Sequence, residues 1–366
     1  MKLLYITSQI KGDGGLQRIM AIKTNYFIEN FGYKIDILAP DLGDDLFFDF
    51  NKSIGFHFIK SKPKKIARLL EYKKQVQKHI NNLKPDCIIV SDFGLKGFTI
   101  PLVIKTKTPI IFEAHGSKYN ESAYYRKTFF TSIFHNLKYV YKDFCANKFD
   151  FFVALSDESL KEWSVQKGFV IPNCLDSLDH TVSNLNSKKA IIVARHSYEK
   201  GLDRVLKIWK LVAHKHSDWQ LEIYGGKDQK LGLKELVNKL NLVSNVTFFK
   251  PVKNIQQKYQ EASMYLMTSR FEGFGMVILE AMSIGLPVIA FDCPVGPRSI
   301  ITNNKNGFLI EDGNLILFAE KVCQLIESQD LRTEIAINAI KTVKKYDTDK
   351  VMMLWKNLFD QVENKA

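Results

Sequence analysis

The sequence predicts an α/β protein built from two doubly wound parallel sheets. Short apolar runs rich in β-branched residues alternate with stretches of helical periodicity along the chain, which is the pattern of βα units. A polar stretch at residues 171–189, beginning Ile171-Pro172-Asn173, interrupts this alternation near the middle and is typical of a linker. The length of 366 residues and a hydrophobic content of 46% are enough to fill two cores.

Buried strands are expected in both halves. In the first half they are predicted at 3–7, 34–39, 86–91, 109–113 and 150–155, and in the second at 190–194, 219–224, 245–249, 264–268 and 286–291. A last helix is predicted at 348–363. The apolar run at the N-terminus is too short for the core of a signal peptide, so we expect it to be the first strand.

Positive charge is concentrated in the first half of the chain. The net charge is +13, and residues 1–172 contain 26 Lys and Arg against 17 acidic residues, compared with 26 against 22 in the remainder. We therefore expect the first half to meet an anionic partner, which could be nucleic acid, a membrane surface or a phosphorylated acceptor. Five cysteines without metal spacing favour a reduced, cytoplasmic protein. No apolar run is long enough for a transmembrane helix.

The segment 269–313 carries the densest chemical signal. Its turn contains Gly273 and Gly275 and leads directly into a predicted helix at 276–282. Free backbone N–H groups at a helix N-terminus, approached closely across glycines, form a site for an anion such as a phosphate. A strand at 286–291 follows, and its exit loop is expected beside the turn at the carboxyl edge of the sheet.

Two glutamates, Glu272 and Glu280, are separated by seven residues in this segment. They are too far apart for one acid/base pair, and they suit two separate acceptors for the hydroxyls of an elongated ligand whose phosphates lie between them. The alternative is an ordinary βα unit with solvated glutamates. An apolar run surrounds Glu280, however, and a carboxylate there is costly to bury without a partner.

This segment resembles the nucleotide-sugar site of the retaining family 4 glycosyltransferases, whose signature is two glutamates seven residues apart around an F-G-F-G-like turn. The resemblance implies the GT-B fold, with two Rossmann-like domains facing each other across a cleft. It places an acceptor-binding domain at 1–175, on which the helix at 348–366 packs, and a donor-binding domain at 187–347. It also implies that Glu280 binds the ribose, and that Glu272 with the backbone of Gly273, Phe274 and Gly275 binds the transferred sugar and the β-phosphate.

Two cations, Arg195 and Lys200, flank a short loop after the strand at 190–194 and can converge on one diphosphate. They match the family's G-R-x(4)-K-G pattern, which implies that they bind the donor phosphates. They would stabilise charge on the departing nucleotide, as metals do in other transferases, so neither a metal nor a cofactor is expected.

The glycine-rich loop after the first strand contains Gly14, Gly15 and Arg18. An oxidoreductase with a dinucleotide fingerprint is the alternative interpretation, but the spacing is not G-x-G-x-x-G. The resemblance implies that this loop closes over the donor phosphates and the acceptor. His115 ends a strand before Gly116, and the resemblance implies that it points toward the transferred sugar; a purely structural histidine is the other possibility.

Two stretches could contact a membrane. Residues 60–84 place nine cations against the single acid Glu71, and residues 119–144 mix aromatic with basic residues. Both also suit ordinary amphipathic helices at the protein surface. No nucleic-acid-binding motif accompanies them, so a nucleic-acid partner is not expected.

The expected function is retaining transfer of a hexose or N-acetylhexosamine from a nucleotide sugar, with UDP as the expected nucleotide, to a polyprenyl-diphosphate-linked or other cell-surface glycan acceptor. Capsule and lipopolysaccharide assembly are the processes that this implies. The alternatives are a small soluble acceptor, or a non-catalytic sugar- or lipid-binding protein of the same fold. The expected catalytic residues are Glu272, His115, Arg195 and Lys200, and the expected location is the cytoplasm, peripherally on the inner face of the membrane.

Overall fold

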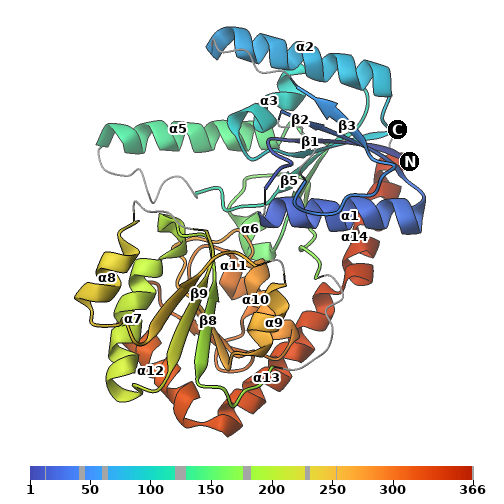
Figure 1. Cartoon of the computed structure of the whole chain (residues 1–366). Helices are drawn as coiled ribbons and strands as arrows, with labels where there is room; N and C mark the ends of the chain where they lie inside the picture. Colours follow the sequence, from blue (N-terminus) through green and yellow to red (C-terminus); the bar gives the residue numbers. More distant parts are fainter. Residues whose placement is uncertain are drawn as a thin grey trace. The chain divides into compact units, whose positions relative to one another are not determined.

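The chain divides into two units, Met1–Cys174 with Thr348–Ala366 and Leu175–Asp347. The structure is a computed structural model that describes residues 1–12, 14–40, 46–59, 65–119, 129–175, 183–226, 231–252 and 254–364; the side chains of helix residues 65–70 and 129–134 are not described. Each unit has one parallel sheet with helices on its faces, which confirms the predicted α/β class (Figure 1).

The first unit contains a seven-stranded sheet in the order β3-β2-β1-β4-β5-β6-β7. All of its pairings are parallel, and Leu3 of β1 lies opposite Cys87 of β4 and Ile35 of β2. The strands are β1 Lys2–Thr7, β2 Lys34–Ala39, β3 Gly55–Phe58, β4 Cys87–Ser91, β5 Ile110–Ala114, β6 Phe151–Ala154 and β7 Gly168–Val170. The edge strands β3 and β7 were not predicted, because both are short and only partly buried.

Helices cover both faces of this sheet. The cores on the two faces show that α1 and α14 pack on one side, and α2, α3 and α5 on the other. Trp355 of α14 is 1% exposed, and its ring lies 6.4 Å from that of Phe27 in α1. The helices are α1 Gly15–Phe31, α2 Lys65–Leu83, α3 Leu95–Val103, α5 Phe129–Ala146, α6 Asp157–Lys161 and α14 Thr348–Glu363.

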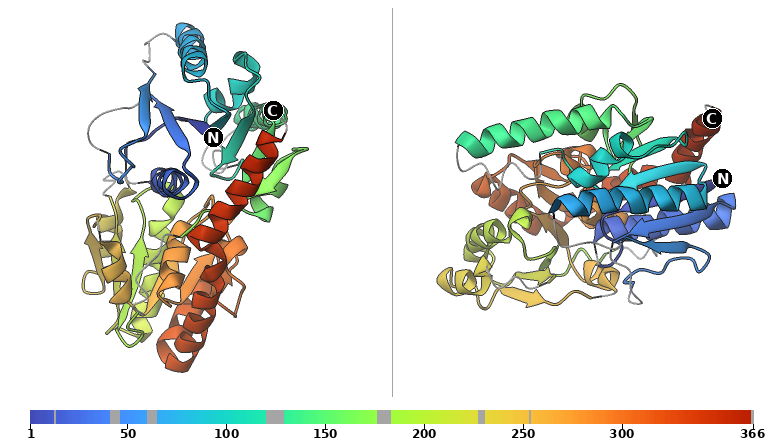
Figure 2. Two further views of the ribbon diagram at one scale, coloured as in Figure 1. Left: turned by 90° about the vertical axis from the view of Figure 1, so that its right-hand side faces the viewer. Right: turned by 90° about the horizontal axis from the view of Figure 1, so that it is seen from above.

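The second unit contains a six-stranded parallel sheet in the order β10-β9-β8-β11-β12-β13. Its strands are β8 Lys189–Val193, β9 Gln220–Tyr224, β10 Val246–Phe249, β11 Met264–Met267, β12 Val288–Phe291 and β13 Phe308–Ile310. Its helices are α7 Leu202–Lys215, α8 Leu233–Lys239, α9 Ile255–Gln260, α10 Met276–Ser283, α11 Gly296–Ile300, α12 Leu315–Glu327 and α13 Gln329–Val343, with 3₁₀ turns η1 Tyr198–Lys200 and η3 Lys344–Tyr346. Figure 2 shows these elements from two further sides.

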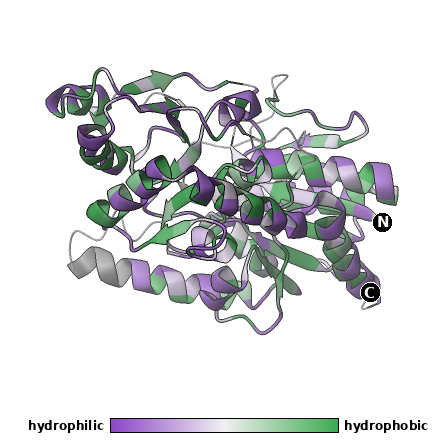
Figure 3. Cartoon of the chain, turned by 90° about the horizontal axis from the view of Figure 1, so that it is seen from below, coloured by the Kyte–Doolittle hydropathy of each residue, from purple (hydrophilic) through white to green (hydrophobic). Residues whose placement is uncertain are grey.

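The hydrophobic pattern explains why these segments became strands and helices. The strands are largely hydrophobic, whereas the surrounding helices alternate hydrophobic and hydrophilic residues (Figure 3). A parallel sheet covered on both faces requires such continuous apolar strands. The five cysteines are free and buried.

Candidate functional site

The carboxyl edge of the second sheet contains a topological switch point. The chain passes from β8 to β9 on one side, while β11 pairs with β8 on the other side. Open α/β sheets bind their ligands outside the carboxyl ends of the strands at such a point. The loops after β8, β11 and β12 therefore form the candidate site.

The turn after β11 is joined to the loop after β12 by backbone hydrogen bonds. The amide of Glu272 donates to the carbonyl of Pro294 over 2.9 Å, and the amide of Val295 donates to the carbonyl of Glu272 over 3.0 Å. A Cβ atom on Gly296 would lie 2.4 Å from the carbonyl oxygen of Phe274, so only glycine permits this close approach. The predicted neighbourhood of the two loops is confirmed.

Arg270 joins the same turn to the loop after β8. Its guanidinium donates to both carboxylate oxygens of Asp203, over 2.9 and 2.8 Å, and lies 4.1 Å from the centre of the Tyr198 ring. Its backbone amide donates to the carbonyl of Glu199 over 2.7 Å. Burial raises the pKa of Asp203, but the hydrogen bonds and charge of Arg270 outweigh it and lower that pKa below its usual value. These contacts hold the two loops in one fixed arrangement.

Two glycines set the shape of these loops. Gly201 has φ +63°, and a Cβ atom there would lie 2.1 Å from the carbonyl oxygen of Thr268. Gly275 has φ +96° and is the residue before the first turn of α10. Left-handed backbone of this kind favours glycine. Gly275 thus turns the chain so that the N-terminal amides of α10 lie beside the turn, the arrangement that the sequence predicts for an anion.

Glu272 and Lys200 meet directly. The Lys200 ammonium donates to Glu272 Oε1 over 2.6 Å, and the Ser269 hydroxyl donates to the same oxygen over 2.7 Å. The side chains of Lys200 and Glu272 are 19% and 10% exposed. In such a pair at the binding edge of the sheet, the ammonium can also bind a phosphate and the carboxylate can also accept a hydrogen bond from a sugar hydroxyl.

Glu280 lies on α10, eight residues beyond Glu272, and is only 7% exposed. Its carboxylate accepts a hydrogen bond from the Tyr259 hydroxyl over 3.1 Å. A hydroxyl donor lowers the cost of burying this charge and fixes the carboxylate's direction. Tyr259 was not predicted, because it comes from α9, which the spacing of the two glutamates does not include.

The remaining predicted residues of this unit differ in their surroundings. The Arg195 side chain is 69% exposed, with its Nη2 3.5 Å from Glu199 Oε1. Phe274 is 3% exposed, and its ring lies edge-on to that of Tyr346 at 5.7 Å. The Phe274 side chain therefore anchors the turn, while Gly273 beside it is half-buried.

The glycine-rich loop of the first unit leads into α1. Gly14 precedes the helix in an extended conformation, and a Cβ atom there would lie 2.6 Å from Oε1 of Gln17. Gly15 is exposed at the helix start, and Arg18 is half-buried in the first turn. Asp13 lies outside the described residues.

A charged group lies at the carboxyl end of β5. The side chain of Glu113 is 2% exposed, pairs with Lys23 of α1 and accepts a hydrogen bond from the Ser91 hydroxyl over 3.0 Å. His115 Nε2 lies 3.2 Å from Glu113 Oε1, at an angle that does not make a hydrogen bond. Burial raises the pKa of Glu113, but the charges of His115 and Lys23 outweigh it and hold that pKa well below its usual value. These two basic side chains thus favour the ionised form of the carboxylate, and Lys23 was not predicted.

Asp92 is a second residue that was not predicted. It follows β4, next to the ends of β1 and β5, and is 5% exposed. Burial raises its pKa, although its carboxylate accepts a hydrogen bond from the amide of Gly94 over 2.9 Å. A buried acid with a raised pKa at the carboxyl edge of a sheet is a candidate for ligand binding. Its signal in the sequence was an acid directly after an apolar strand.

Family models match nearly the whole chain. The model described as Glycosyltransferase Family 4 matches residues 14–177, and the model described as Glycosyl transferases group 1 matches residues 177–342. The chain belongs to the family 4-like GT-B glycosyltransferases. The oxidoreductase interpretation of the glycine-rich loop is therefore set aside.

Three bacterial proteins illustrate what this glycosyltransferase is similar to. The amylovoran biosynthesis glycosyltransferase AmsD of Erwinia amylovora is 26% identical over 98% of this chain and 99% of its own length. The poly(ribitol-phosphate) alpha-N-acetylglucosaminyltransferase of Staphylococcus aureus is 30% identical over 61% of this chain and 46% of its length. The crystal structure of Anabaena HepE in complex with UDP-glucose has a TM-score of 0.77 at 18% identity, covers 99% of this chain and 100% of HepE, and shares the fold.

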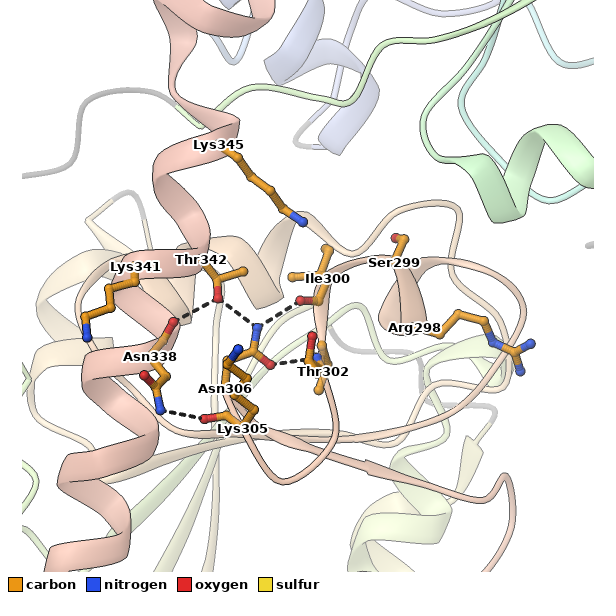
Figure 4. Close-up of a pocket in the computed structure, with 11 residues that line it drawn as sticks. Arg298, Ser299, Ile300, Thr302, Lys305, Asn306, Asn338, Lys341, Thr342 and Lys345 are labelled. Atoms are coloured by element: carbon orange, nitrogen blue, oxygen red, sulfur yellow. Dashed lines mark hydrogen bonds between the residues drawn. The ribbon is translucent and has the colours of Figure 1, made fainter.

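A basic pocket of the second unit lies between the C-terminal ends of α11 and α13 (Figure 4). It has a volume of about 380 Å³, and its lining includes Arg298, Lys305, Lys341 and Lys345. Cations at helix C-termini compensate the helix dipoles. Hydrogen bonds from Asn306 to the Ile300 carbonyl, over 3.1 Å, and to Thr342, over 2.9 Å, close its floor. None of the predicted site residues lines this pocket.

Neither a metal cluster nor a membrane-spanning helix is found in the part of the chain that the structure describes. No three His, Cys, Asp or Glu side chains there are grouped to hold a metal ion, and no helix is long and apolar enough to cross a membrane. The chain contains an Asp-x-Asp sequence, Asp347 to Asp349, which leads into α14. Among the described residues, it does not belong to a group of side chains that could hold a metal ion, and Asp349 accepts a hydrogen bond from the Tyr26 hydroxyl over 2.6 Å.

Proposed function

We propose that this glycosyltransferase transfers a hexose or N-acetylhexosamine from a UDP-sugar to a cell-surface glycan acceptor with retention of the anomeric configuration. The observation that carries the proposal is the grouping of Lys200, Glu272 and the N-terminus of α10 at the switch point of the second sheet. This edge offers a cation, a carboxylate that can accept hydrogen bonds from sugar hydroxyls, and backbone amides at a helix N-terminus. A sugar joined to a nucleotide diphosphate needs all three.

The donor diphosphate would lie between Arg195, Lys200 and the first amides of α10. The exposed Arg195 side chain can form a planar fork on the phosphates, whereas Lys200 acts as a point charge. Both would stabilise the negative charge that develops on the leaving nucleotide, so the proposed reaction needs no metal or cofactor. Glu280 would bind the ribose hydroxyls, and HepE with UDP-glucose supports UDP as the nucleotide.

Retention follows from front-face attack in this proposal. The nucleotide departs, and a donor phosphate oxygen takes the proton of the acceptor hydroxyl that attacks from the same face. Glu272 is held by Lys200 and Ser269 and therefore serves to position the sugar. The S. aureus relative is named as an alpha-N-acetylglucosaminyltransferase, which agrees with an α-linked product.

The acceptor would bind at the carboxyl edge of the first sheet. Gly14, Gly15 and Arg18 lie at the N-terminus of α1, which follows β1, and His115 lies directly after β5. Asp92 is a further buried hydrogen-bond acceptor at this edge. AmsD is named for amylovoran biosynthesis, which supports a cell-surface glycan as the acceptor. We propose a polyprenyl-diphosphate-linked acceptor, as in capsule or lipopolysaccharide assembly, and peripheral attachment of the cytoplasmic enzyme to an anionic membrane.

The test is transfer followed by NMR of the product. The purified enzyme is incubated with UDP-glucose or UDP-N-acetylglucosamine and a polyprenyl-diphosphate-linked sugar, with and without EDTA, and the anomeric coupling constant of the new bond is measured. We expect an α-linkage and no effect of EDTA. Lys200→Gln should lower kcat/KM about 100-fold, because it removes one charged contact made to the leaving group. Lys210→Gln, an exposed lysine on α7, is the matched control.

Three results would each contradict a part of the proposal. A β-linked product from the α-linked donor would exclude front-face retention. Release of no nucleotide from any UDP-, GDP-, ADP- or dTDP-sugar, even to water, would favour a non-catalytic sugar-binding protein of the same fold. Equal turnover of a small soluble sugar would assign the acceptor to the soluble class.

A further inference from the structure

The described part of α5 carries apolar side chains on its outer face. Leu137 is 64% exposed, Val140 67%, Tyr141 38% and Phe144 52%. Their spacing of i, i+3, i+4 and i+7 places them in one stripe along the helix. We call these four residues the α5 stripe.

The opposite face of α5 is the buried one, so the stripe is not the core-facing side of the helix. Tyr139, Cys145 and Ala146 are at most 6% exposed, and the last two belong to the core between the helices and the sheet. A surface helix of a soluble protein normally has one apolar face and one polar face. An exposed apolar stripe of this length marks an interaction surface.

Neighbouring helices extend the same surface. α3 packs between α2 and α5 on one face of the first sheet (Figure 1). Leu95 and Leu102 of α3 are 42% and 43% exposed. The apolar character of the layer is therefore shared by two adjacent helices.

Positive charge accompanies these apolar residues. The described side chains of α2, α3 and α5 include six lysines against two acids, Glu71 and Asp143. Of the lysines only Lys142 is buried, and Asp143 is paired with Lys118. Lys73, Lys74 and Lys78 are exposed on α2. Lys148, just beyond α5, holds its ammonium 5.1 Å from the centre of the Phe144 ring. Cations at the border of an apolar stripe suit the headgroup region of an anionic bilayer.

We infer that the layer formed by α2, α3 and α5 docks on an anionic phospholipid surface, with the α5 stripe entering the boundary between headgroups and acyl chains. The charge decides in favour of lipid as the occupant, because a second copy of this chain would bring the same cations to the contact. The inference deepens the proposed function, on which it rests in one respect: a lipid-linked acceptor would reach the enzyme at this surface. Of the stretches that the sequence suggested for membrane contact, residues 60–64 and 120–128 lie outside the described residues.

The experiment is flotation of the full-length protein with phosphatidylcholine vesicles that contain either no anionic lipid or about 30% phosphatidylglycerol. The test variant combines Leu137→Ser, Val140→Ser and Phe144→Ser. The matched control combines Leu211→Ser, Val243→Ser and Ile316→Ser, which are 45%, 70% and 67% exposed in the second unit. All six side chains are exposed, so both variants are expected to fold, and circular dichroism checks this.

We expect the wild type and the control to float with anionic vesicles and the stripe variant to lose at least about tenfold in partition coefficient. Replacing Lys73, Lys74 and Lys78 by Gln should weaken binding to anionic vesicles and abolish most of its salt dependence. Equal partitioning of the stripe variant and the wild type would overturn the inference. Stripe-dependent self-association in sedimentation, without vesicle binding, would overturn it too and assign the stripe to a second copy.

Release of UDP from the donor to water, measured without vesicles, separates this inference from the proposed function. It should be the same in the wild type and the stripe variant, because the stripe contains no residue of the candidate site. If the wild type releases UDP but does not float, the membrane inference fails alone. If it floats and releases none, the proposed reaction fails alone.

Discussion

Glu113 shows how single residues make the edge of the first sheet. Its carboxylate is buried and touches Lys23, Ser91 and His115, which come from α1, from the end of β4 and from the residue after β5. Such a carboxylate is stable only because its partners are charged or donate hydrogen bonds, since burial alone would favour the protonated form. The group fixes α1 and His115 to one strand end.

Glu113→Gln is expected to destabilise the first unit in a pH-dependent way. The folded pKa of Glu113 is lowered, so its contribution is fully present above the unfolded pKa, about 4.3, and is lost as the pH falls through the lower folded value. Breaking a buried pair costs about 3–5 kcal/mol at pH 7. The difference between the wild type and the variant should therefore shrink as the pH falls below about 4.

Urea unfolding at several pH values between neutral and acid, followed by hydrogen exchange in peptides of β5, measures this difference. Glu158→Gln, which removes an exposed pair with Lys161, is the control and should leave the free energy of unfolding nearly unchanged at every pH. A Glu113→Gln effect of the same size at neutral and acid pH would contradict the assignment of the charge.

The sequence could predict those site residues that belong to a short, recognisable pattern. Glu272, Glu280 and Lys200 were expected from a spacing and a turn, and the structure brings Lys200 to Glu272. Lys23 and Tyr259 have no local signal of this kind, and Asp92 had only its place directly after an apolar strand. Lys23 lies 90 residues from Glu113 in sequence, and their meeting depends on which strands are neighbours.

At the level of elements, contacts between two loops of the second unit set the geometry of the candidate donor site. The loop after β8 and the turn after β11 are joined by Arg270, by the Thr268 hydroxyl, which donates to the Gly201 carbonyl over 3.0 Å, and by the close passage of Gly201. Their arrangement places Lys200 beside Glu272. The donor site is thus expected to depend on a glycine that would contact no ligand.

Gly201→Ala should destabilise the second unit by about 1–3 kcal/mol and weaken donor binding. The new Cβ would lie 2.1 Å from the carbonyl oxygen of Thr268, and the residue would keep φ +63° only under strain. Gly226→Ala is the control, because a Cβ there has nothing within 4 Å. Urea unfolding and titration with a UDP-sugar measure both effects. Wild-type affinity in Gly201→Ala would show that the loops are not coupled.

Elements differed in how well the sequence predicted them. The long buried strands and the helices at 276–283 and 348–363 were expected nearly to the residue, because their periodicity is strong. The strands β3, β7 and β13 were not expected. Each has three or four residues at or near a sheet edge, where burial on both faces is incomplete and the apolar pattern is weak.

At the scale of the whole molecule, the chain combines two doubly wound units whose switch points each gather chemically active side chains. In the first unit these side chains are Asp92, Glu113 and His115, and in the second they are Lys200 and Glu272. The fold class followed from the alternation of strands and helices. The sugar, the acceptor and the linkage do not, because loop shape and not motif identity selects them.

The most direct test of the donor site is a binding measurement on the wild type and on Glu280→Gln. UDP-, GDP-, ADP- and dTDP-sugars and NAD are titrated in the presence and absence of EDTA, and thermal stability is recorded at saturating ligand. A ligand at about 100 times its Kd contributes roughly 2.7 kcal/mol, which is measurable in a protein of this size.

We predict that a UDP-sugar stabilises the wild type with or without EDTA and that Glu280→Gln binds it about 10 to 100 times more weakly, since hydrogen bonds to a charged carboxylate contribute about 1.5–3 kcal/mol. The free variant should unfold at nearly the wild-type temperature. Unchanged affinity of Glu280→Gln for the UDP-sugar, or a wild-type response to NAD alone, would contradict the donor site described above.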